Sequence, residues 1–235
     1  LSGAHLYRYN MSGVGGLLVD LGAIGSGSLN VRDIALQTTR DTTTAVSGHL
    51  LTGLSFNLRN LVWFDAANPN NIRRVVRLNG VTTGQSMVAI DYSSTGTLYG
   101  LGYNSGTQTY QLYLIDSATG NVSAVNSTPF SLNLGSDDGS GNRINAGFRF
   151  IPTLANRIRV MGNNGSINAQ IDAATGAIAA TDTAVNFITG DVNFGASASV
   201  SSIAFTGFNG DTATQMFGFD NNTGTMLMFN RNNTM

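Results

Sequence analysis

The residues best suited to bind a metal ion lie in a polar loop predicted at residues 131–146. Its segment SDDGSGN brings Asp137, Asp138 and Asn142 close together along the chain. Carboxylate and amide oxygens are the ligands that Ca²⁺ prefers. The spacing is not that of an EF-hand, and the chain has no Glu to supply a bidentate ligand. Calcium binding is one interpretation of this loop, and a solvated loop with Asx-turns is the other.

A group of arginines could bind an anionic ligand or an acidic partner. Arg73, Arg74 and Arg77 lie on one predicted strand. Arg157 and Arg159 are two residues apart, so they face one side of a strand. Guanidinium groups bind carboxylates and phosphates through paired hydrogen bonds. The first group is therefore a candidate partner-binding surface, and the alternative is a ladder of Arg–Asp pairs on a solvated face.

Side chains that could act as a general acid, base or nucleophile are scarce. The chain has two histidines, His5 and His49, and no Cys, Lys or Glu. Neither histidine lies in a catalytic signature, and no Gly-x-Ser-x-Gly turn is present. The Gly-rich segments at 13–16 and 22–28 do not fit a phosphate-binding loop. We therefore expect no enzymatic activity and no cofactor other than the calcium considered above.

Two further features could bind a ligand. Tyrosines cluster along one stretch of the chain, at Tyr92, Tyr99, Tyr103 and Tyr110. Exposed tyrosines would support sugar or protein binding, whereas buried ones pack between strands. A second polar loop is predicted at 186–199, and long loops often carry binding residues.

The composition indicates which elements must position these residues. All 12 basic residues are Arg and all 13 acidic residues are Asp, and the chain has 29 Gly. Lys and Glu favour helices, whereas Asp, Asn, Ser, Thr and Gly do not, so an all-β fold is predicted. The net charge of −1 gives no attraction to nucleic acid. No apolar stretch approaches the roughly 18 residues that span a membrane.

One unit recurs about every 50 residues: a short apolar strand, a turn that begins with Asp or Asn, and a second strand. The five turns begin at Asn10, Asp65, Asp116, Asp172 and Asp220. An Asp or Asn side chain accepts N–H bonds from residues just ahead and so initiates a turn. Each unit therefore predicts a β-hairpin.

Between the hairpins lie more apolar runs, at 31–36, 87–92, 147–152 and 201–207, and each is followed by a second strand. Four strands in about 50 residues are typical of a propeller blade. We predict an all-β propeller of about five four-stranded antiparallel blades, or six, whose first blade is incomplete. Residues 1–235 would form a single domain. Either residues missing from a longer chain or a partner strand would close it, and we favour the first.

The segments GFRFIPTLANRIRVMG, LYLIDSATG and IDAATGAIAATDTAV, followed by ITGDVNFG, carry a resemblance to a known family. Residues 48–235 resemble a family of bacterial, mostly exported proteins known only as a domain of unknown function. Residues 1–36 resemble the closing repeat of that family. Arg149, Ile151 and Asn156 stand where the family has Asp, Asn and Asp, so a site built on those residues would be lost here. The resemblance implies a propeller-like fold and an extracytoplasmic location.

These features favour a non-catalytic protein-interaction or scaffold module in the periplasm or outside the cell. Its partner would be another protein or a second copy, in an envelope or membrane-associated assembly. A propeller that binds a small ligand, a glycan or calcium is the alternative, because of the two polar loops and the tyrosines. An enzyme that uses Asp, Arg, Tyr and Ser is the third hypothesis.

Overall fold

The computed structural model describes residues 4–10, 17–27, 29, 31–36, 48–55, 59–135, 144–163, 167–206 and 214–229. Within these ranges the elements are strands, apart from one short 3-10 turn, η1 (Ile24–Gly27). The all-β prediction is therefore confirmed. The chain divides into two compact units, the first made of Leu1–Asn79 and Asp116–Asn121 and the second of Gly80–Ile115 and Val122–Met235.

The first unit contains a four-stranded antiparallel sheet in the order β3-β4-β5-β6. Its strands are β3 (Val31–Leu36), β4 (Leu50–Ser55), β5 (Asn60–Asp65) and β6 (Asn68–Arg77). Strands β1 (His5–Asn10) and β2 (Leu17–Ala23) pair with each other, and β2 and η1 contact β6. Buried Ile24, Val62 and Phe64 form the centre of this unit's core.

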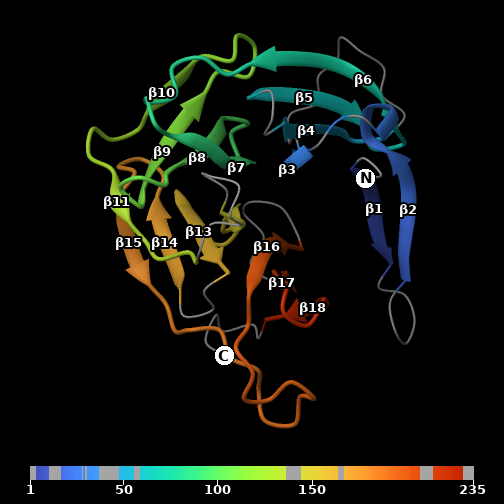
Figure 1. Cartoon of the computed structure of the whole chain (residues 1–235), viewed down its shortest axis with the longest axis vertical. Coiled ribbons are helices and arrows are strands. Elements are labelled where there is room, and N and C mark those ends of the chain that lie inside the picture. Colours follow the sequence, from blue (N-terminus) through green and yellow to red (C-terminus); the bar gives the residue numbers. More distant parts are fainter. Residues whose placement is uncertain are drawn as a thin grey trace. The chain divides into compact units, whose positions relative to one another are not determined.

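The second unit contains three antiparallel sheets, which follow one another along the chain (Figure 1). The first has β7 (Ser86–Tyr92), β8 (Leu98–Asn104), β9 (Thr109–Ile115), β10 (Val122–Ala124) and the short β11 (Phe130–Ser131). The next has β12 (Ala146–Phe150), β13 (Arg157–Gly162), β14 (Asn168–Asp172) and β15 (Ile178–Thr181). The last has β16 (Val200–Phe205), β17 (Met216–Asp220) and β18 (Thr225–Met228).

The sheets of the second unit pack face to face through their apolar side chains. Strand β12 contacts both β7 and β16, so the first strands of the three sheets lie side by side. Because side chains alternate along a strand, β13 serves two cores. Ile158 and Val160 pack toward the β7–β11 sheet, and Met161 packs with Val200 and Ile203 on the opposite face. This layering of small antiparallel sheets is β-propeller-like.

The turns of the hairpins follow the predicted physics. In the turn between β9 and β10, the carboxylate of Asp116 accepts the N–H of Ala118 at 2.8 Å and the hydroxyl of Thr119 at 2.6 Å. Gly120 follows with a φ of 76°. The same Asp-x-x-Thr-Gly arrangement recurs at residues 172–176 and 220–224. All five predicted hairpins are present.

The predicted number of blades is wrong. The described residues form four blade-like sheets, not five or six, because β1 and β2 make only a two-stranded sheet. Among these sheets, the Asp220 turn joins the second and third strands, whereas the Asp65, Asp116 and Asp172 turns join the third and fourth. Local turn chemistry is the same in both settings and does not by itself reveal the position of a turn within a sheet.

Candidate functional site

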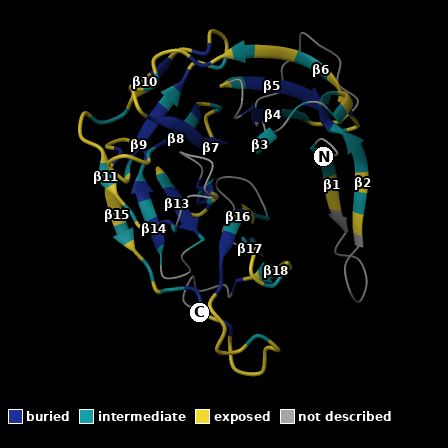
Figure 2. Ribbon diagram, viewed as in Figure 1, coloured by how far each residue is buried: buried dark blue, intermediate teal, exposed yellow. Residues whose placement is uncertain are grey.

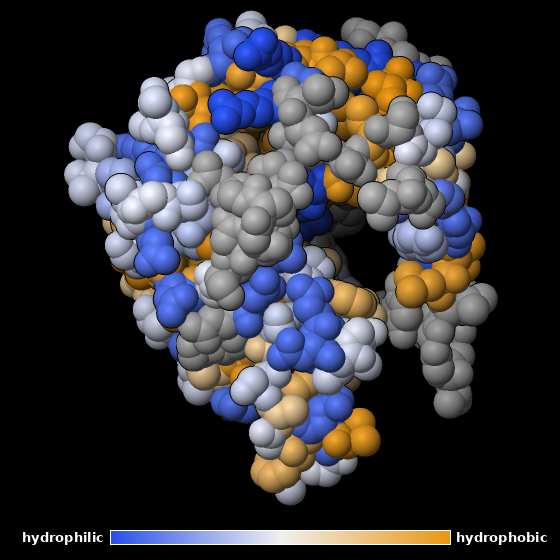
Figure 3. Space-filling view, viewed as in Figure 1, coloured by the Kyte–Doolittle hydropathy of each residue, from blue (hydrophilic) through white to orange (hydrophobic). Residues whose placement is uncertain are grey.

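An apolar loop lies between β15 and β16, where the sequence predicted a polar one. Ile188, Val192 and Phe194 are 62%, 95% and 61% exposed. Figure 2 shows most of this loop as exposed, and Figure 3 shows hydrophobic residues gathered at its end of the second unit. Exposed apolar side chains that lie together mark interaction surfaces, whereas single ones need no explanation.

Hydrogen bonds give this loop a defined shape. The carboxylate of Asp191 accepts the N–H of Asn193 at 2.7 Å, and its carbonyl accepts the N–H of Phe194 at 3.1 Å. A bridge between Asn186 and Ser197 closes the base of the loop. Asp191 and Asn193 therefore form an Asx-turn that holds the apolar tip in place.

Strand β18 contributes the other side of the site. Leu227 and Phe229 point into the core of the last sheet, while Met226 and Met228 alternate with them and are 44% and 72% exposed. Methionine is flexible and fits irregular surfaces, which suits it to binding sites. The strand therefore presents an apolar face that its own sheet does not cover.

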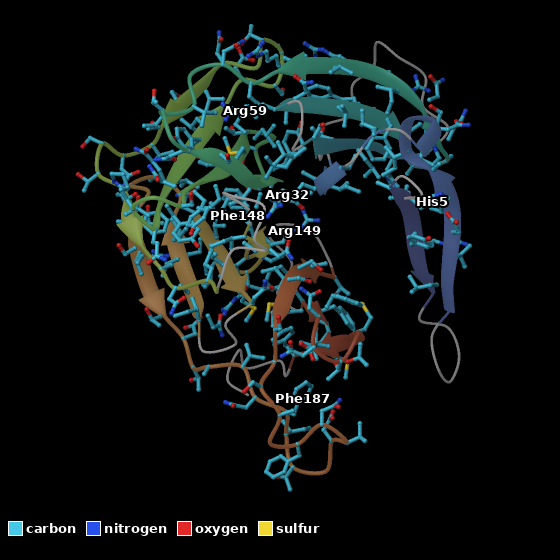
Figure 4. The ribbon with its side chains drawn as sticks, in the orientation of Figure 1. His5, Arg32, Arg59, Phe148, Arg149 and Phe187 are labelled. Atoms are coloured by element: carbon cyan, nitrogen blue, oxygen red, sulfur yellow. The ribbon has the colours of Figure 1, made fainter. Side chains whose placement is uncertain are left out.

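The loop and the strand enclose an apolar groove of about 750 Å³. We call it the β18 groove, and it is lined by residues 185–188, 191–193, 215 and 225–229. Phe187, at the start of the loop, is only 9% exposed and forms part of its floor (Figure 4). Among the described lining residues, Asp191 is the one with an ionisable side chain. An apolar, nearly uncharged groove suits hydrophobic contact with a partner.

The edge of β18 beside this groove is free within the described residues, where β18 pairs only with β17. The N–H of Phe229 donates to the carbonyl of Met216 at 3.0 Å, so residue 229 directs its backbone groups toward β17. Alternate residues of an antiparallel strand direct them the opposite way. Met226 and Met228 therefore present N–H and C=O groups to a further strand.

A second hollow in the same unit is polar. It has a volume of about 760 Å³ and lies between the β8–β9 turn and the chain that follows β11. We call it the polar cavity, and its lining comprises Tyr103, Thr107, Gln108, Tyr110, residues 131–133, Gly135, Ile144 and Asn163. The predicted tyrosine cluster thus supplies two rings to it, although both rings are almost fully buried.

The predicted partner-binding arginines of β6 differ in their surroundings. Arg73 lies 3.5 Å from the buried carboxylate of Asp65. Arg74 lies over the ring of Trp63, 5.1 Å from its centroid, and donates to the carbonyl of Ala118. Arg77 is exposed. The structure thus gives two of the three a contact within the first unit.

The predicted metal ligands Asp137, Asp138 and Asn142 lie outside the described residues. Within the described part of the chain, no three His, Asp or Glu side chains come together as a metal site would require. His5 pairs with Asp20 at 2.8 Å on the surface of the β1–β2 hairpin. His49 is exposed, and its carbonyl accepts the N–H of Ala66.

Sequence reasoning missed the surroundings of Arg159. It is fully buried, 2.9 Å from the carboxylate of Asp182, and it also donates to the side chain of Asn168. Burial lowers its pKa from the ordinary value, and Asp182 acts against this shift. A solvated Arg–Asp ladder on this face is therefore wrong for Arg159. The two-residue spacing places Arg157 and Arg159 on one face but does not show what covers it.

The β18 groove was also missed, although a signal for it exists. Phe187, Ile188, Val192 and Phe194 are four large apolar residues within 186–199, between two predicted strands. We classified this segment as polar because of its Gly, Asn and Ser residues. Large apolar side chains that a loop cannot bury are the signal of a binding surface.

Fold and site together define an all-β protein of blade-like sheets with an exposed apolar groove. Residues 60–235 match the model of a domain of unknown function (DUF4394), and the chain belongs to this family. The predicted resemblance is therefore confirmed. No curated protein matches the sequence of the chain. No helix among the described residues is long and apolar enough to cross a membrane.

Several solved structures are similar to this chain. A protein of unknown function from Bacteroides caccae has 10% identity and a TM-score of 0.44, over 93% of this chain and 65% of that one. A chain of the nidogen/laminin complex has 12% identity and a TM-score of 0.49, and the match covers 93% of this chain and 65% of that one. The β-propeller domain of Cps50 (Swd1) from Myceliophteria thermophila has 9% identity and a TM-score of 0.43, and the match covers 96% of this chain and 64% of that one. The chain thus spans just under two thirds of each.

Proposed function

We propose that this chain is a non-catalytic protein-binding module that docks its partner in the β18 groove. The observation that carries the proposal is the exposed apolar tip of the loop, with Ile188, Val192 and Phe194, beside an edge of β18 that no described strand occupies. Hydrophobic side chains give such a contact its affinity, while the backbone groups of the edge give it register. The shortage of His and the absence of Cys, Lys and Glu also support binding over catalysis.

The occupant is an extended strand of the partner, which pairs with β18 as a fourth strand. The comparison with the other three blade-like sheets supports this. Each of them has a fourth strand, namely β6, β10 or β15, but the last sheet has three strands within the described residues. Strand addition to an unpaired edge is a general mode of peptide recognition. The internal repeat thus predicts what occupies the edge.

The chemistry of the occupant follows from its counterparts in the second unit. Strand β15 has the sequence IAAT and β10 has VSA, both short and uncharged. Asp191 is the only ionisable side chain that the described residues contribute to the groove lining, and its negative charge disfavours an acidic segment. We therefore expect an uncharged strand whose alternate residues are small or apolar.

A labelled peptide with the sequence of residues 175–181, which contains β15, is a suitable probe. Fluorescence anisotropy should show saturable binding with a Kd of about 0.1 to 1 mM, as for a short strand without tertiary support. The same peptide with Ala180→Pro lacks one backbone N–H and should bind more weakly. Absence of binding by the first peptide at saturating concentration would contradict the proposal.

Variants of the chain distinguish strand addition from nonspecific hydrophobic binding. Met228→Pro removes an N–H that points to the free edge and leaves the β17–β18 ladder intact. Ile188→Asp places a charge on the groove at a residue that is 62% exposed. Each should weaken binding by about tenfold or more. Leu154→Asp, at an exposed residue outside the groove, is the matched control and should bind as before. Undiminished binding by Met228→Pro would rule out strand addition.

A further inference from the structure

The two methionines of strand β18 are exposed, unlike the other methionines that the structure describes. Met226 and Met228 are 44% and 72% exposed. The others are at most 6% exposed, namely Met87, Met161 and Met216. The remaining two of the seven lie outside the described residues, namely Met11 and Met235. The described methionines that solvent reaches therefore both line the β18 groove.

The register of the last sheet places these methionines beside aromatic rings. Met226 lies opposite Phe219 of β17, and Met228 lies opposite Phe217. Residues directly opposite each other share a face of the sheet, and both phenylalanines are half-buried. Thioethers pack favourably against aromatic rings. The four side chains form an apolar face, which a strand added to β18 would extend.

A thioether is the group of this chain that a peroxide oxidises most readily, because the chain has no Cys. The sulfur attacks one oxygen of hydrogen peroxide, so that an S–O bond forms and the O–O bond breaks. The sulfur loses two electrons and the peroxide gains them. The proton of the transferred oxygen passes to the departing hydroxide, which leaves a sulfoxide and water. Oxidation follows exposure, so Met226 and Met228 should react before the buried methionines.

A sulfoxide at either position would disfavour a bound strand. It is polar and accepts hydrogen bonds, whereas the thioether is apolar. A partner strand that covers Met226 or Met228 would remove the sulfoxide from water, and the rings of Phe217 and Phe219 offer it no donor. In the free chain both sulfoxides stay hydrated. The cost therefore falls on the bound state.

We propose that Met226 and Met228 form a reversible oxidation site that weakens docking in the β18 groove. The effect on docking rests on the proposed function, whereas the selectivity of oxidation depends only on the exposure of the two side chains. The oxidant is a peroxide. Methionine sulfoxide reductases specific for each sulfoxide epimer reverse the reaction. The chain thus binds its partner strand in the reduced state and releases it in the oxidised state.

Peptide mapping after limited treatment with hydrogen peroxide tests the selectivity. Cleavage before Asp places Met216 in residues 211–219 and both β18 methionines in residues 220–235, and fragment ions assign the added oxygen to a residue. We expect Met226 and Met228 to be oxidised at least about tenfold faster than Met216, Met87 and Met161. Equal rates for the exposed and the buried methionines would overturn the oxidation site.

Fluorescence anisotropy with the peptide of residues 175–181, which contains no Met, Cys or Trp, tests the effect on docking. The oxidised chain should bind it at least about tenfold more weakly. Its circular dichroism spectrum should be unchanged, because both side chains are exposed in the folded state. Treatment with the two reductases should restore the affinity. Unchanged affinity in a chain oxidised at Met226 and Met228 would overturn the control of the groove.

Two variants assign the effect to these residues. In Met226→Leu combined with Met228→Leu, the affinity should be the same before and after peroxide, whatever its value. Met87→Leu replaces a buried methionine and, as the matched control, should keep the full effect of peroxide. Persistence of the effect in the double variant would contradict the assignment. Absence of binding by the untreated parent chain would instead contradict the proposed function, and the oxidation rates would still test the oxidation site.

Discussion

The guanidinium of Arg149 on β12 donates to the buried carboxylate of Asp91 on β7, and so connects the first strands of two neighbouring sheets. The N–H of Phe150 donates to the same carboxylate at 2.8 Å. Burial raises the pKa of Asp91, while Arg149 and this N–H act against the shift. Arg149 thus pairs with the buried negative charge of Asp91, which would be unfavourable in the core without a partner.

Removal of Arg149 should therefore destabilise the second unit. Arg149→Ala leaves the Asp91 carboxylate buried with one donor fewer, which should lower the free energy of unfolding by about 3 kcal/mol. Urea denaturation at pH 7 measures this loss. In the double variant Arg149→Met with Asp91→Asn no charge remains, and much of the loss should be recovered. An equal loss in both would show that the ion pair is not the cause.

Two glycines in the same turn motif should respond differently to substitution. Gly120 and Gly224 have φ values of 76° and 67°. A Cβ on Gly120 would lie 2.1 Å from the carbonyl oxygen of Arg77, whereas a Cβ on Gly224 would meet no atom of the described residues within 4 Å. Gly224→Ala should therefore cost about 1 kcal/mol of stability from strain alone. Gly120→Ala adds a backbone clash and should cost about 3 kcal/mol.

Chemical denaturation of both variants provides the comparison. Each carries the same substitution in the same motif, so the difference between them reports the neighbouring backbone and not the turn. Losses of equal size would mean that residues 116–121 do not pack against Arg77.

The hairpins could be predicted from sequence because their signal is local. The Asp, Thr and Gly of each turn lie within five residues, and the carboxylate reaches its donors without help from the rest of the fold. The number of blade-like sheets depends on which strand lies beside which, and that depends on contacts between distant residues. Asp220 shows the limit, because its turn has the same sequence pattern as Asp116 but another place in its sheet.

The candidate site was harder to predict for a similar reason. Met226 and Met228 alternate with Leu227 and Phe229, so the sequence gives two apolar faces and does not show which one is covered. The loop 186–199 has the Gly and Asn content of a polar turn. Its apolar residues form a groove only because β18 lies beside them. The tyrosine cluster could be predicted from the sequence, but whether its rings are buried depends on the strands that pack around them.

The stability of the last sheet should depend on pH through Asp220. Burial acts to raise the pKa of this carboxyl, but the hydroxyl of Thr223 and the N–H groups of Ser199 and Asn222 outweigh it, and the pKa lies below its ordinary value of 3.8. The folded state therefore binds this proton less readily than the unfolded state. The contribution to stability is present above pH 3.8 and is lost as the pH falls through the folded-state pKa.

Asp220→Asn tests this dependence. Above pH 5 or so the variant should be less stable than the parent chain by about 1 kcal/mol, since a charged acceptor is replaced by a neutral one. Near about pH 2 the difference should shrink, because the parent carboxyl is then protonated as well. Unfolding midpoints in urea at the two pH values measure it. A difference that does not change with pH would contradict the assignment.

The contact of Arg74 with Trp63 can be followed by fluorescence, because Trp63 is the only tryptophan of the chain. The guanidinium carbon of Arg74 lies over the ring, 5.1 Å from its centroid, and Trp63 is 5% exposed. Arg74→Ala removes the cation and uncovers part of the indole. We expect a red shift of the emission and a loss of about 1 kcal/mol of stability.

Neighbouring variants on β6 distinguish a structural role from partner binding. Arg74→Lys keeps a cation near the ring and should retain part of the stability. Arg77→Ala changes an exposed side chain and should alter neither the emission nor the stability. If an acidic partner binds this strand, its affinity should fall in Arg77→Ala while the fold is unchanged. An unshifted emission in Arg74→Ala would show that the guanidinium does not cover Trp63, and would leave Arg74 as well as Arg77 available to such a partner.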